Sequence, residues 1–102
     1  MVALIEDKRD AIEELCRRFG VVRLYLFGSA TRDDFCPGES DIDLLVDFGS
    51  MDGRSKAHAY FDLLNELQAV LGTDVDLVMV GAVKNRYLAR DIERTKQELY
   101  AA

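Results

Sequence analysis

Three aspartates occupy positions at which acidic oxygens could share metal ions. Asp41 and Asp43 are two residues apart in a segment that alternates between apolar and polar residues. In a β-strand this spacing sends both carboxylates to the same face. Asp76 lies in a second apolar segment, where a buried unpaired charge would be costly and would require a partner or a cation. Mg²⁺ prefers hard oxygen ligands, would relieve the repulsion among the three carboxylates and would keep positions open for a substrate phosphate.

A Gly-Ser pair follows directly after an apolar, β-branched segment and could hold a triphosphate. Gly28 lets the backbone approach a ligand closely, and Ser29 offers both an amide and a hydroxyl to a phosphate oxygen. Each feature alone is weak, because Gly-Ser turns are common and an Asp-x-Asp pair also occurs on solvated sheet edges. The ordered combination of the turn with the three aspartates indicates a metal and triphosphate site.

The elements that position these residues follow from the spacing of apolar side chains. Apolar residues at helical spacing predict three helices, and β-branched, aromatic or alternating residues predict three strands. The order αββαβα indicates an α/β (α+β) layer architecture with a small three-stranded mixed sheet covered by helices. The helices are expected over residues 3–19, about 57–71 and about 84–100, the strands over residues 21–27, 41–48 and 75–80, and mainly loop, with or without one initial helical turn, over residues 29–40. The apolar stripe of the last helix is expected to consist of Leu88, Ile92, Thr95 and Leu99.

Length, composition and charge narrow the class of protein. A chain of 102 residues, 49% apolar and 31% charged, fits one compact domain over residues 1–102. Charged residues interrupt residues 1–19, so we expect neither a signal peptide nor a membrane span, and a cytoplasmic location. The net charge of −6 argues against direct binding of nucleic acid, because a basic surface normally supplies that affinity.

The motif sequence as a whole resembles a known family. The segment "LFGSATRDD", followed by "SDIDLLVDF" and "VDLVMV", is similar to the minimal nucleotidyltransferases of the DNA polymerase β superfamily. Their pattern is a strand, Gly-Ser, a short loop, Asp-x-Asp and a later strand aspartate, and the tail "NRYLARDIERTKQELY" is similar to their closing helix. The resemblance implies a polymerase β-like fold and two-metal transfer at the α-phosphate of a nucleoside triphosphate, with release of pyrophosphate.

The resemblance also implies a role for each motif residue. Asp41 and Asp43 would bridge two Mg²⁺ ions, and Asp76 would ligate the catalytic metal and help deprotonate the acceptor hydroxyl. Gly28 and Ser29 would hold oxygens of the triphosphate.

Other positions near the motif leave alternatives open. Family members usually have a glycine after the arginine of this motif, whereas Asp33 follows Arg32 here and would either repel the triphosphate or point to solvent. Arg32 could neutralise phosphate charge or pair with a neighbouring aspartate. Ser40, counted with the nucleotide-binding residues, could equally hydrogen-bond at the junction of loop and strand. Asp74 stays open as an alternative to Asp76, because both would share a strand face.

The resemblance extends to a biological role. Among stand-alone minimal nucleotidyltransferases, the chain resembles above all the antitoxin half of HEPN/MNT toxin–antitoxin pairs. This implies an adenylyltransferase that moves AMP from ATP to a tyrosine of a HEPN ribonuclease toxin and so neutralises it. A catalytically idle antitoxin that masks the toxin, and transfer to a small-molecule hydroxyl, are the alternatives. The sequence leaves open the acceptor residue, the base preference and whether the chain forms a homo-oligomer or a hetero-oligomer with the toxin.

Overall fold

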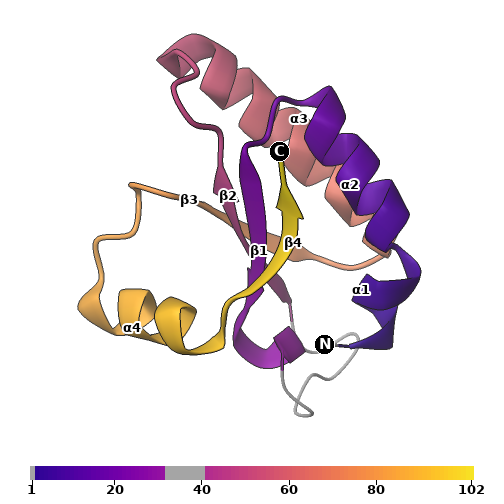
Figure 1. The fold of residues 1–102 in the computed structure, drawn as a ribbon, viewed down its shortest axis with the longest axis vertical. Coiled ribbons are helices and arrows are strands. Elements are labelled where there is room, and N and C mark those ends of the chain that lie inside the picture. Colours follow the sequence, from indigo (N-terminus) through magenta and orange to yellow (C-terminus); the bar gives the residue numbers. More distant parts are fainter. Residues whose placement is uncertain (1, 32–40) are drawn as a thin grey trace.

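Four strands form one mixed sheet in the computed structural model, which describes residues 2–31 and 41–102 (Figure 1). The sheet order is β3-β2-β1-β4, in which β1 is antiparallel to both β2 and β4, and β2 runs parallel to β3. A parallel pair needs a crossover connection, and helix α3 supplies it between β2 and β3. The strands are β1 (Arg23–Phe27), β2 (Ile42–Asp47), β3 (Val75–Met79) and β4 (Gln97–Ala101).

The helices lie on the two faces of this sheet. Helices α2 and α3 pack against each other over one face, whereas α4 lies apart from them (Figure 1). Among the described residues, no helix combines the length and apolar character that crossing a membrane requires. The helices are α1 (Ala3–Asp7), α2 (Arg9–Arg18), α3 (Gly53–Leu71) and α4 (Arg86–Thr95), and a short 3₁₀ turn, η1 (Gly28–Thr31), follows β1.

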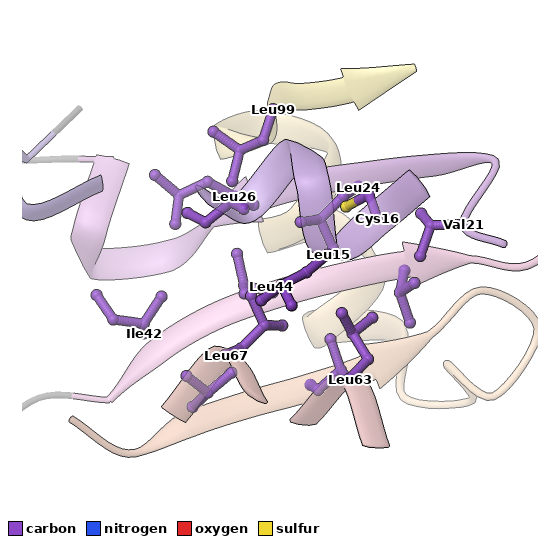
Figure 2. Close-up of a cluster of buried hydrophobic side chains, with 14 of the residues drawn as sticks. Leu15, Cys16, Val21, Leu24, Leu26, Ile42, Leu44, Leu63, Leu67 and Leu99 are labelled. Carbon is purple, nitrogen blue, oxygen red and sulfur yellow. The ribbon is translucent and has the colours of Figure 1, made fainter. Parts of the chain in front are cut away.

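The main core lies between the sheet and the pair α2 and α3. β2 alternates as predicted, because Ile42, Leu44 and Val46 are fully buried in this core. Figure 2 shows how leucines of α2, α3 and β4 meet the strand side chains there. Burial of Cys16 in the same cluster raises its pKa to about 12, so the thiol stays protonated and acts as a packing residue.

The expected single helix over residues 3–19 is two helices. Lys8 lies between α1 and α2. Its φ of −106° and ψ of 9° are outside helical geometry. Ile5 and Ile12, on either side of the break, are both fully buried. The apolar spacing continues across the break, so periodicity alone does not reveal it.

The expected helix to residue 100 is also wrong, and so is the strand count of three. α4 begins at the Asn85 cap and ends at Thr95, after which Lys96 is extended and β4 pairs with the free edge of β1. Leu99, expected on the helix stripe, is instead buried in the main core from β4. Pairing with β1 satisfies the backbone of this segment, which is a long-range effect that a local pattern does not contain. The mixed α/β class itself is confirmed.

Candidate active site

The register of the parallel pair brings two of the predicted acids together. Asp43 of β2 lies directly opposite Asp76 of β3. Side chains opposite each other on neighbouring strands point to the same face of the sheet, and here it is the face opposite the main core. Asp41 precedes β2 by one residue and, like Asp76, is exposed. Asp76 was expected to be buried, and its exposure corrects that expectation.

Negative charge is concentrated around Asp43. Partial burial, followed by the charges of Asp76, Asp41 and Asp91, raises the pKa of Asp43 to about 6. A half-buried carboxylate surrounded by other carboxylates is destabilised in its charged form, and a hard divalent cation would offset that repulsion. The donor set therefore suits Mg²⁺, although within residues 2–31 and 41–102 no three acidic, histidine or cysteine side chains already converge as a metal-holding group.

The glycine of the Gly-Ser turn lies against this carboxylate. Gly28 has a φ of +73°, and a Cβ placed on it would lie 2.5 Å from Oδ2 of Asp43. Glycine is strongly favoured here, because this backbone angle disfavours other L-residues and because an added Cβ would require the carboxylate to shift. The backbone at Gly28 therefore passes close to Asp43. Its predicted approach to a phosphate stays a prediction.

Two hydroxyl groups hold the peptide groups of Gly28. The Gly28 N–H donates to Oγ1 of Thr95, at 3.0 Å, and the Thr31 hydroxyl donates to the Gly28 carbonyl, at 2.6 Å. Thr95 in turn donates its own proton to the Asp91 carbonyl, at 2.7 Å. The Gly28 amide is thus engaged within the protein.

Sequence reasoning missed Thr95 and Asp91. Thr95 was assigned to the apolar stripe of the last helix, and its partner Gly28 lies 67 positions earlier in the chain. The one available signal was a hydroxyl residue on an otherwise apolar helix face, which does not identify its partner.

Helix α3 fixes the strand that carries Asp76. The Tyr60 hydroxyl donates to the carbonyl of Leu77, at 2.6 Å, and the Val75 N–H donates to Oε1 of Gln68, at 3.1 Å. Burial, and then the charge of Asp76, raise the pKa of Tyr60. The backbone on both sides of Asp76 is therefore bonded to side chains of α3.

The remaining predicted residues take different places. Ser29 is partly buried in η1, next to Gly28. Asp74 lies just before β3, where its carbonyl accepts from the Ile42 N–H at 3.1 Å, and the register places Asp76 rather than Asp74 opposite Asp43. Arg32, Asp33 and Ser40 lie outside the described residues.

This fold, with a glycine turn beside acids on adjacent strands, is that of a nucleotidyltransferase. Residues 8–99 match the family described as Nucleotidyltransferase domain, and the chain belongs to that family. The resemblance read from the motifs is confirmed. Protein adenylyltransferase MntA of Thermococcus cleftensis is 40% identical over 73 residues, which cover 72% of this chain and 70% of the relative.

Solved structures agree with this assignment. A toxin–antitoxin crystal structure with AMP-PNP superposes with a TM-score of 0.70 at 26% identity, covering 92% of this chain and 73% of the other. A complex of tri-AMPylated Shewanella oneidensis HEPN toxin with MNT antitoxin gives a TM-score of 0.65 at 24% identity, covering 95% of this chain and 72% of the other. The second match is a likeness of fold alone.

Proposed function

We propose that this chain is a Mg²⁺-dependent protein adenylyltransferase that acts as an antitoxin. It transfers AMP from ATP to a tyrosine hydroxyl of a HEPN ribonuclease toxin and thereby neutralises it. The observation that carries the proposal is the pairing of Asp43 with Asp76 beside the Gly28 turn. The identity with an MntA adenylyltransferase and the structural match to a toxin–antitoxin pair with AMP-PNP support the choice of donor and acceptor.

The acidic residues would bind the metal ions, and one of them would also accept a proton. Asp41, Asp43 and Asp76 would hold the two Mg²⁺ ions, which when bound would neutralise charge on the phosphates. The new bond joins the tyrosine oxygen to the α-phosphorus, the bond from that phosphorus to the bridging oxygen of the β-phosphate breaks, and pyrophosphate leaves. The exposed carboxylate of Asp76 accepts the proton of the tyrosine hydroxyl.

The glycine turn and its neighbours bind the triphosphate in this proposal. Because Gly28 has no side chain, the backbone passes close to Asp43. Ser29 offers its amide and hydroxyl to phosphate oxygens. Arg32 and Ser40 complete the nucleotide-binding residues. The proposal retains a single domain, a cytoplasmic location and no direct contact with nucleic acid.

Exposed apolar side chains near α4 suit a protein acceptor. Tyr87 of α4 is 78% exposed, and Val80, just after β3, is 50% exposed. Val80 also lines an apolar groove with Leu45 and Ile92, on the face of the sheet that carries Asp43. Exposed apolar surface of this kind is typical of a contact with another protein.

Labelling of the partner tests the proposal. The chain, its HEPN partner, Mg²⁺ and ATP labelled at the α-phosphate should give a labelled partner, with the label on tyrosine. The double variant Asp41→Asn with Asp43→Asn should abolish labelling. The control Asp7→Asn with Asp62→Asn removes the same charge from two exposed helix positions and should leave labelling intact. Absence of label with the unaltered chain, or full label with the double Asn variant at the site, would reject the proposal.

A purely binding antitoxin is the second candidate, because Asp33 replaces the usual glycine of the motif and adds a negative charge four positions after Ser29 in the sequence. Cells that express the toxin with the double variant at Asp41 and Asp43 distinguish the two. Rescue of growth by that variant would favour masking, whereas loss of rescue would favour catalysis.

A further inference from the structure

We propose that Thr95 is a positioning residue that holds the Gly28 turn against Asp43 and so sets the affinity for the triphosphate. The part of this inference that concerns nucleotide rests on the proposed function. Thr95 is the last residue of α4, and it is partly buried. It links the helix on one face of the sheet to the turn that follows β1.

The Thr95 hydroxyl has the groups that both of its hydrogen bonds require. A threonine hydroxyl has one proton to donate and lone pairs to accept with. Thr95 donates to the carbonyl of Asp91, at 2.7 Å, which leaves its oxygen free to accept from the Gly28 N–H, at 3.0 Å. The bond to Asp91 fixes the hydroxyl proton away from Gly28, so that the oxygen lone pair faces the amide.

Three side chains constrain the position of Gly28. Thr95 accepts a hydrogen bond from the Gly28 N–H, Thr31 donates one to the Gly28 carbonyl, and Oδ2 of Asp43 lies 2.5 Å from the position that a Cβ would take. A rotation of this peptide would bring the backbone into Asp43 or away from it. The amide bond to Thr95 is therefore one of the contacts that set the distance between the turn and the acid.

Helix α4 is itself anchored beside the turn. Ile92 of α4 is buried against Phe27 and Leu45 in a separate apolar cluster, and Phe27 is the residue before Gly28. Movement of α4 would therefore be transmitted both by this packing and by the Thr95 hydroxyl.

A purely local role explains only half of these contacts. A threonine near the end of a helix often donates to the carbonyl four residues earlier, and the bond to Asp91 is of this type. This local preference does not account for the hydrogen bond that Thr95 accepts from Gly28, because Gly28 lies in another element. The second bond is the observation that points to positioning.

Two variants of Thr95 separate the hydroxyl from the shape of the side chain. Thr95→Val keeps the branched shape and removes the hydroxyl, and Thr95→Ser keeps the hydroxyl and removes a methyl group. Amide hydrogen exchange of Gly28 reports the bond itself without any nucleotide. Calorimetric titration with AMP-PNP and Mg²⁺ reports the consequence for the triphosphate.

We expect Gly28 to be protected in the unaltered chain and in Thr95→Ser, and to exchange rapidly in Thr95→Val. We expect Thr95→Val to raise the Kd for AMP-PNP about tenfold and Thr95→Ser to change it less than about threefold. Protection of Gly28 retained in Thr95→Val, equal weakening in both variants, or unchanged affinity in Thr95→Val would overturn the inference. An unaltered chain that binds no AMP-PNP would reject the proposed function and the nucleotide part of this inference, while Gly28 exchange would still decide the Thr95 bond.

Discussion

The two faces of the sheet differ in what they bury. Towards α2 and α3, the side chains of the strands are apolar and fully enclosed, as Leu24, Leu26 and Leu44 show. Towards α4, a small apolar cluster around Leu45 adjoins the partly buried Asp43. The same strand, β2, contributes to both faces because its side chains alternate.

This difference separates stability from chemistry within a small fold. Burial of apolar surface against α2 and α3 stabilises the sheet, whereas the acids on the other face repel one another. Substitutions on the first face should therefore act on unfolding, and substitutions on the second should act on catalysis. Measurements of unfolding and of catalysis on the same variants test whether the two faces act separately.

The largest expected effect is the loss of activity in Asp43→Asn. Removal of a carboxylate that we propose to hold Mg²⁺ should lower kcat/KM for transfer to the toxin about a thousandfold, or roughly 4 kcal/mol of transition-state stabilisation. The free energy of unfolding should not fall, because the charged form of this carboxylate is destabilised in the folded chain. Labelling kinetics and urea unfolding measure the two quantities. A variant that loses both activity and stability would argue against the separation.

A substitution on the opposite face should do the reverse. Leu63 of α3 is fully buried in the main core, and Leu63→Ala should lower the free energy of unfolding by about 3 kcal/mol. Leu64→Ala, at a partly exposed neighbouring position, should cost distinctly less. Under conditions where Leu63→Ala remains folded, its Kd for AMP-PNP should match that of the unaltered chain. A higher Kd would show that packing in the main core also affects nucleotide binding.

A side chain added at Gly28 should destabilise the folded chain. Gly28→Ala should lower the free energy of unfolding by about 2 kcal/mol or more, because the new Cβ meets Asp43 and because φ is positive. Gly81→Ala is the matched control, since its φ is +92° and no atom lies within 4 Å of an added Cβ. Thermal unfolding of the two variants isolates the contact with Asp43 from the backbone cost. Equal losses would mean that the carboxylate moves away freely.

The smallest expected effect is on the pH dependence of stability without metal. The pKa of Asp43 is raised from 3.8 to about 6, so the folded state binds this proton more tightly than the unfolded state. Its contribution to stability is complete below pH 4 and is lost as the pH rises through 6. After allowance for its partial exposure, the loss should be about 1 kcal/mol. Urea unfolding in chelator at pH 4 to 7 measures it, and Asp43→Asn should abolish this component of the slope.

Sequence patterns predicted the local features of this molecule and missed the long-range ones. Alternation in β2 correctly placed Asp43 on the face away from Ile42, whereas Asp41 lies one residue before the strand. The pairing of Asp43 with Asp76 could not be derived from either strand, because register depends on how the crossover through α3 packs. The family motif, rather than periodicity, selected Asp76 over Asp74.

The end of the chain shows the same limit. Apolar residues at helical spacing predicted one helix to about residue 100, yet the chain leaves the helix after Thr95 and pairs with β1. The edge of β1 is available only once the sheet has formed, and the Gly28 amide becomes a partner of Thr95 only once α4 has packed. Such contacts form only in the folded chain and produce no periodic pattern in the sequence.

The bonds from α3 to β3 also bear on how the protein can assemble. β3 is the outermost strand on its side of the sheet, and the edge of such a strand is a common place for another chain to add. Here Tyr60 and Gln68 already occupy backbone groups of Leu77 and Val75. A neighbouring molecule could extend the sheet at this point only by displacing both side chains. Contact with a toxin or a second copy along this margin should therefore rely on side chains rather than on added strands.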